Sequence, residues 1–127
     1  QEMSTAVQYK LPIKIFILNN QYMGMVRQWQ ELLHEKNYSE SYTAALPDFV
    51  KLAEAYGCVG IQATKPDELD EKINEMININ EPVIFDCRVD PAENCFPMIP
   101  SGKPHNQMLL GPEDEKEEVS DEGKTLV

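Results

Sequence analysis

The sequence predicts an α/β fold in which helices cover both faces of a parallel sheet, and two observations predict it. Apolar runs of the kind found in buried strands alternate with segments whose apolar residues recur at helical spacing. Strands that alternate with helices form parallel sheets through right-handed crossovers. A chain of 127 residues with 42% hydrophobic content is large enough for one domain with one core.

The first half of the chain predicts a helix, a strand and a second helix. Apolar residues recur at helical spacing from Met3, and Pro12 ends this helix because the residue before a proline disfavours the helical conformation. Residues 13–18 form a nearly continuous apolar run, which is typical of a strand covered on both faces. The next helix places its apolar side chains on one face: Met25, Trp29, Leu32 and Leu33. Residues 37–46 are polar and predict a loop.

The second half predicts two more strands and two more helices. A helix starts near Pro47, a good first-turn residue, with Asp48 beside it, and ends at Gly57. A short strand over residues 59–63 precedes a helix that opens at Pro66. Residues 83–89 form a strand with bulky side chains on both faces, and the proline-rich remainder is irregular.

Three parallel strands leave two bare sheet edges, and the opening helix has no strand before it. We therefore expect the chain to be the C-terminal part of a longer protein. We divide it into a domain of residues 1–111 and a tail of residues 112–127. The tail holds seven acidic residues and two lysines, which is typical of a solvated end.

Charge and composition exclude several classes of partner. Acidic residues outnumber basic residues by 22 to 11, whereas nucleic-acid binding needs clustered lysine and arginine. There is no run of about 18 apolar residues, so we expect no membrane span. The three cysteines are an odd number without a C-x-x-C motif, which is typical of a reducing compartment. We therefore expect a cytoplasmic protein with neither nucleic acid nor membrane as a partner.

The cysteines and histidines do not predict a site of their own. Cys58 and Cys87 lie beside or within predicted strands with no histidine near in sequence, so we interpret them as buried structural thiols. His34 and His105 are far from each other and from the cysteines, which excludes a zinc site, and we expect both at the surface.

Asn19 and Asn20 end the first predicted strand, immediately before a helix. Ligands of open parallel sheets bind beyond the carboxyl ends of the strands, and helix N-termini favour phosphate. Amide and carbonyl oxygens suit Mg²⁺. The pair therefore indicates either an ordinary turn, the commoner case, or a metal-diphosphate site.

Two blocks of this sequence carry a resemblance. Leu11–Trp29 reads LPIKIFILNNQYMGMVRQW and resembles the second half of the thiamine-diphosphate motif, and Phe96–Gly102 reads FPMIPSG. Both are similar to the catalytic subunits of the acetohydroxyacid synthase (acetolactate synthase) family, the second block to a C-terminal active-site segment. Gln1–Ala6 resembles the helix after the first half of the motif. The match extends to about Pro112 and implies the C-terminal portion of a thiamine-diphosphate-binding fold.

The resemblance also implies cofactor ligands. The Asn20 side chain and the Tyr22 backbone carbonyl match Mg²⁺ ligands, and Asn20, Gly24 and Met25 match cofactor-binding positions. The family's Gly-Asp-Gly, its proton-relay glutamate and its FAD-holding domain have no counterpart in these residues. The resemblance therefore implies thiamine diphosphate, Mg²⁺ and FAD for the complete enzyme, and no catalytic residue in this piece, which alone we expect to bind cofactor poorly and to be inactive.

Met25 and Trp29 have two interpretations. Their spacing by four residues is most often that of a core stripe. In the resembled family the matching methionine and tryptophan line the substrate channel, and the tryptophan favours 2-ketobutyrate as second substrate. The Trp29 and Ser101 positions match residues where herbicidal inhibitors bind in that family. We take all three as substrate-channel residues, and the proline-stiffened loop of residues 96–102 as a cap of that channel rather than plain surface packing.

The resemblance implies that the complete enzyme condenses pyruvate with a second 2-keto acid, pyruvate or 2-ketobutyrate, with loss of CO₂, in branched-chain amino acid biosynthesis. It also implies a homodimer or higher assembly and a possible small regulatory subunit. Two alternatives stay open. One is a sibling enzyme such as a pyruvate oxidase, a glyoxylate carboligase or a sulfoacetaldehyde acetyltransferase. The other is a truncated, non-catalytic interaction module.

Overall fold

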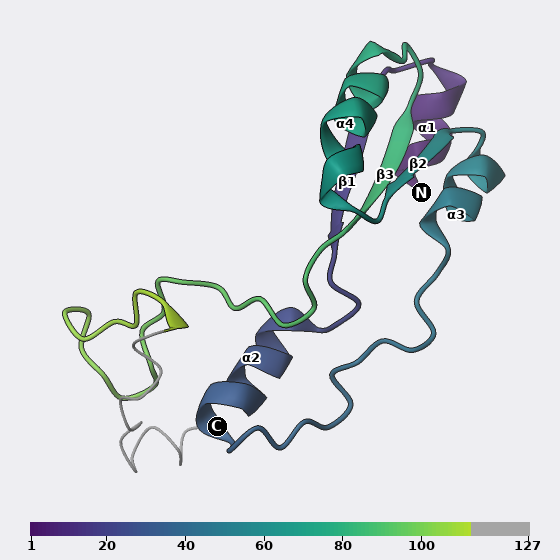
Figure 1. Ribbon diagram of the computed structural model, residues 1–127. Helices are drawn as coiled ribbons and strands as arrows, with labels where there is room; N and C mark the ends of the chain where they lie inside the picture. Colours follow the sequence, from purple (N-terminus) through teal and green to yellow (C-terminus); the bar gives the residue numbers. More distant parts are fainter. Residues whose placement is uncertain (113–127) are drawn as a thin grey trace. The chain divides into compact units, whose positions relative to one another are not determined.

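The three strands of the described residues form one parallel sheet. The computed structural model describes residues 1–112 of the chain. Strands β1 (Lys14–Asn19), β2 (Val59–Ala63) and β3 (Val83–Arg88) lie in the order β1-β3-β2, so the last strand is the central one. The predicted parallel sheet is confirmed, and Figure 1 shows it with its helices.

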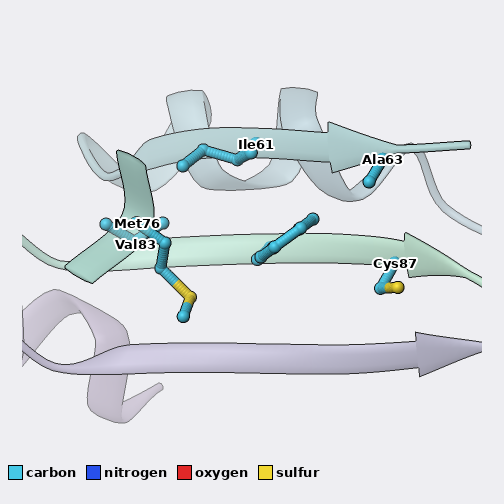
Figure 2. Packing of buried hydrophobic residues seen from close by; sticks show 6 residues of the cluster. Ile61, Ala63, Met76, Val83 and Cys87 are labelled. Atoms are coloured by element: carbon cyan, nitrogen blue, oxygen red, sulfur yellow. The ribbon is translucent and has the colours of Figure 1, made fainter. Parts of the chain in front are cut away.

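Helices cover both faces of this sheet, as predicted. Helix α4 (Leu69–Asn78), which follows a 3₁₀ turn at Pro66–Glu68, packs on one face. Helices α1 (Glu2–Gln8) and α3 (Phe49–Tyr56) pack on the other (Figure 1). The cluster under α4 contains Ile61, Ala63, Met76, Val83, Phe85 and Cys87. Figure 2 shows its labelled members from β2 and β3 side by side.

Edge strand β1 differs from the expectation for residues 13–18. Central β3 is buried from Val83 to Cys87, which agrees with its bulky side chains on both faces. In β1, by contrast, Phe16 is 39% and Leu18 is 69% exposed. The prediction that this strand is covered on both faces is wrong within the described residues. The physical reason is that the cluster under α4 draws its strand residues from β2 and β3 alone.

Local sequence signals explain the bounds of α3. The Asp48 carboxylate accepts a hydrogen bond from the Lys51 N–H (3.1 Å), so Asp48 is the N-cap and Pro47 lies before the helix, not in its first turn. Gly57 ends the helix in the left-handed conformation (φ 79°), as predicted. Gly60 in β2 passes so close to Val50 of α3 that a Cβ there would lie 2.9 Å from its backbone.

The chain divides into two compact units. The first comprises residues 1–21 and 44–90 and contains the sheet with α1, α3 and α4. The second comprises residues 22–43 and the chain from residue 91, and contains α2 (Gly24–Leu33). The predicted boundary between a domain of residues 1–111 and an acidic tail stays a prediction, because residues 113–127 lie outside the described residues.

The second unit is mostly irregular, as the prolines predict. Met98 and Leu109 exchange two backbone hydrogen bonds of 2.9 and 2.7 Å, which close the loop between them. Tyr22 and Tyr42 form a second short bridge, with ring centroids 5.1 Å apart. None of the helices over residues 1–112 is both long enough and apolar enough to cross a membrane.

Candidate functional site

A buried carboxylate connects the three strands near their carboxyl ends in the first unit. Asp86 of β3 is 1% exposed. Its oxygens accept hydrogen bonds from Asn19 Nδ2 of β1 (2.7 Å) and Gln62 Nε2 of β2 (2.9 Å), and Arg88 Nε lies 3.3 Å away. These contacts satisfy a charge that would otherwise be costly to bury. Sequence analysis missed this residue, although an acid inside the apolar strand VIFDCR was a signal for it.

The two asparagines at the end of β1 have different environments. Asn19 is 5% exposed, and its Oδ1 accepts a hydrogen bond from the Gln21 N–H (3.1 Å) while its Nδ2 bonds Asp86. Asn20 is half-buried. The structure therefore holds Asn19 inside the sheet and leaves Asn20 as the more accessible amide at the sheet's carboxyl edge.

The oxygen atoms that the sequence nominates as metal ligands are chemically suited to Mg²⁺. The Asn20 amide and the Tyr22 backbone carbonyl are both hard, neutral donors. Beside Tyr22, a hydrogen bond of 2.8 Å from the Met23 N–H to the Ser41 carbonyl accompanies the bridge to Tyr42. Residues 1–112 contain no group of three histidine, cysteine or acidic side chains that could hold a metal.

In the second unit, one face of α2 lines a cavity of about 460 Å³. The lining residues are Met25, Val26, Trp29, Gln30, His34 and Asn37. Met25 is 54% and Val26 is 42% exposed, so these two apolar side chains are not sealed in a core, whereas Leu33 of the same helix is buried. The structure thus brings Met25 and Trp29 to one apolar cavity. Sequence analysis missed Val26. The signal for it in the sequence was its position next to Met25.

The opposite face of α2 is polar and buried. Arg27 is 4% and Gln28 is 1% exposed. Gln28 bonds the backbone of Cys95 twice, accepting from its N–H (2.7 Å) and donating to its carbonyl (3.1 Å). Arg27 donates to the carbonyls of Ala92 (2.9 Å) and Glu93 (3.0 Å), and bonds Glu31 and Asn94. These contacts attach residues 92–95 to α2 in place of apolar packing.

Gly24 and Ser101 are the remaining residues that the sequence nominates. Gly24 is the first residue of α2. Ser101 is half-buried in a turn and is not among the six residues that line the α2 cavity. The functional roles of Asn20, Tyr22, Gly24, Met25, Trp29 and Ser101 stay predictions.

The thiols and imidazoles agree with their predicted structural roles. Burial raises the pKa of the Cys58 thiol, and burial together with the Asp86 charge raises that of Cys87. Neither is therefore an activated nucleophile. His34 and His105 are both exposed, as expected.

Comparison with known proteins places this geometry in a family. Residues 1–87 match the family model of the thiamine pyrophosphate enzymes' C-terminal TPP-binding domain. The chain is 45% identical over 117 residues to the acetolactate synthase large subunit of Haemophilus influenzae, covering 91% of this chain and 20% of that protein. It is 47% identical over 113 residues to the large subunit of acetolactate synthase isozyme 3 of Escherichia coli, covering 87% and 20%.

A solved structure shares the fold. It is the thiamine diphosphate-dependent 4-hydroxybenzoylformate decarboxylase of Rhodococcus jostii RHA1, at 27% identity and a TM-score of 0.61, covering 69% of this chain and 16% of that one. The chain spans about a fifth of the length of the curated relatives it matches. The family model covers more than half of the 127 residues. The chain therefore belongs to the thiamine pyrophosphate enzymes, as a part of their C-terminal TPP-binding domain.

Proposed function

We propose that this chain is part of the catalytic subunit of an acetolactate synthase. The observation that carries the proposal is the 45–47% identity to acetolactate synthase large subunits over 113–117 of the 127 residues. Matches of that length include both the Asn19–Trp29 region and Phe96–Gly102. The complete enzyme would condense pyruvate with a second 2-keto acid, pyruvate or 2-ketobutyrate, and release CO₂, as a step of branched-chain amino acid biosynthesis.

The first role of the chain would be to hold the cofactor. Asn20 and the Tyr22 carbonyl would bind Mg²⁺, and residues at the start of α2, Gly24 and Met25, would lie against thiamine diphosphate. The remaining metal ligands would come from the diphosphate and from a carboxylate outside this chain. Bound thiamine diphosphate supplies a carbon nucleophile and an electron sink for decarboxylation of 2-keto acids. FAD would bind in a different domain of the complete enzyme.

The second role would be to shape the path of the second substrate. Met25 and Trp29 line one cavity, whose apolar wall suits the alkyl group of a 2-keto acid. An indole that contacts one added methylene favours the longer substrate by about 1–3 kcal/mol. Trp29 would therefore favour 2-ketobutyrate over pyruvate, and Ser101 would belong to the outer part of the same path.

The proposal extends to assembly and location. We take the complete enzyme to be a homodimer or higher assembly, with a possible small regulatory subunit, as the resembled family implies. We place it in the cytoplasm, because three cysteines without a C-x-x-C motif are typical of a reducing compartment.

Incubation of the complete enzyme with pyruvate, thiamine diphosphate, Mg²⁺ and FAD tests this function. We expect one CO₂ released for each acetolactate formed, and acetohydroxybutyrate when 2-ketobutyrate is added. Acetyl phosphate or peroxide as product would instead indicate an oxidase, and free acetaldehyde a simple decarboxylase. Absence of any turnover with bound cofactor would favour the non-catalytic module.

A further inference from the structure

The central strand carries a carboxylate where its other buried residues are apolar. Val83, Ile84, Phe85 and Cys87 make β3 the most buried strand, and Asp86 lies among them with 1% of its surface exposed. An apolar residue would avoid the free-energy cost of removing a charge from water. Departures of this kind from local folding rules concentrate at functional sites, where the residue that breaks the rule often holds another group in place.

Asp86 holds the side-chain amide of Asn19, and through it the turn that follows β1. The 2.7 Å bond from Asn19 Nδ2 to Asp86 Oδ1 fixes which way the amide is turned, so its Oδ1 faces the Gln21 N–H at 3.1 Å. Gln21 has a φ of 61°, a conformation that costs free energy for a residue other than glycine. The bond from Asn19 offsets part of this cost.

Asn20 lies between the two ends of this connection. Its preceding residue is fixed by Asp86, and its following residue is fixed in the left-handed conformation by Asn19. A backbone that is constrained on both sides fixes the point from which the Asn20 side chain extends, so less conformational entropy is lost when its oxygen meets a ligand. Gln62 and Arg88 occupy the other carboxylate oxygen of Asp86, which keeps it from turning away.

We propose that Asp86 is a positioning residue for Asn20, acting through the Asn19 amide to set the direction from which Asn20 meets Mg²⁺. This inference rests on the proposed function, since it takes Asn20 to be the metal ligand. Partners that orient a metal ligand without touching the metal typically account for 10–100-fold in metal affinity.

The test measures cofactor affinity in the complete enzyme by calorimetric titration with thiamine diphosphate at a series of Mg²⁺ concentrations. Asp86→Ala removes the acceptor of the Asn19 amide, whereas Asp86→Asn keeps an oxygen that can accept the same bond. Asn19→Ala breaks the connection from its other end. Lys14→Met is the matched control, because it removes two 2.7 Å bonds to the carbonyls of Ile79 and Glu81 at the opposite end of β1.

We expect Asp86→Ala and Asn19→Ala each to raise the Mg²⁺ concentration for half-maximal cofactor binding by about 10–100-fold. The double variant loses no more than the worse single variant, since both residues act in series. Asp86→Asn restores most of the affinity and Lys14→Met leaves it unchanged. If Asp86→Ala does not fold, Asn19→Ala alone decides the outcome.

Two results overturn the inference, and they are distinguishable. If Asn20→Ala weakens Mg²⁺-dependent binding while Asp86→Ala and Asn19→Ala do not, Asp86 has only a structural role and the proposed function stands. If Asn20→Ala itself binds thiamine diphosphate and Mg²⁺ like the unchanged enzyme, the ligand assignment fails, and the inference fails with it.

Discussion

At the scale of single residues, neighbours in sequence have opposite environments. Asn19 is bonded within the sheet and Asn20 is half-buried at its edge. Arg27 and Gln28 are buried, while the adjacent Met25 and Val26 are exposed. The Asn-Asn pair alone could not predict which amide is held, because the decision depends on Asp86, 67 residues away. Hydropathy likewise predicted that Met25 and Trp29 share one face of α2. It could not predict that polar contacts would bury the opposite face, which carries Arg27 and Gln28.

At this scale we predict that Trp29→Leu lowers the preference of the complete enzyme for 2-ketobutyrate over pyruvate by about tenfold. The indole is the largest side chain of the α2 cavity, and its loss removes the contact that rewards the added methylene. Competition between the two 2-keto acids, read as the ratio of the two products, measures the effect. An unchanged ratio would place Trp29 away from the substrate path.

The three thiols give a second prediction. At pH 8 iodoacetamide should modify exposed Cys95 first, and Cys58 and Cys87 only after urea is added. Burial raises the pKa of both slow thiols and so lowers their content of thiolate, which is the reactive form. Mass spectrometry of each cysteine-containing peptide over time follows the reaction. Equal rates at all three positions would contradict the described burial.

At the scale of elements, apolar runs and the helical spacing of apolar residues predicted every strand and helix of residues 1–112 to within a few residues. These patterns failed where the burial of one element depends on which other element packs against it. The apolar run of β1 predicted cover on both faces, but α4 packs over β2 and β3. The α3 start was displaced past Pro47 because Asp48 supplies the N-cap hydrogen bond.

The contact between α3 and β2 gives a prediction with a matched control. Gly60→Ala should destabilise the chain by about 1–3 kcal/mol, since its Cβ would lie 2.9 Å from the Cα and carbonyl oxygen of Val50. Gly111→Ala meets nothing within 4 Å and should leave stability nearly unchanged. Urea titration compares the two variants. Equal urea midpoints would contradict the close packing of Gly60 on Val50, because they would show that the added methyl group is accommodated without cost.

The hydrogen bonds that attach residues 92–95 to α2 give another prediction. Gln28→Met keeps the length of the side chain but leaves the Cys95 N–H and carbonyl without their partner, at a cost of about 1–3 kcal/mol. Hydrogen exchange at the Cys95 amide should become faster, while amides of β3 keep their protection.

Asn74→Ala is the control, because it removes a single exposed bond to the Asp70 carbonyl. Unchanged exchange at Cys95 in Gln28→Met would mean that Arg27 alone holds this segment.

At the scale of the whole molecule, this chain spans about a fifth of the length of the curated relatives it matches. The fold class, its parallel sheet and the family were predictable, since they depend on periodicity and on two motif blocks. The strand order β1-β3-β2 was not, because it depends on which strand gains most from burial on both faces. The predicted acidic tail of residues 112–127 falls almost wholly outside the described residues.

The central claim is that Asn20 binds the metal that holds thiamine diphosphate, and one titration tests it most directly. The complete enzyme and its Asn20→Ala variant are titrated with thiamine diphosphate, with and without Mg²⁺, beside Asn80→Ala, an exposed asparagine at the other end of the sheet. We predict Mg²⁺-dependent binding that Asn20→Ala weakens by about tenfold or more and that Asn80→Ala preserves. Equal affinity of all three proteins would contradict the account.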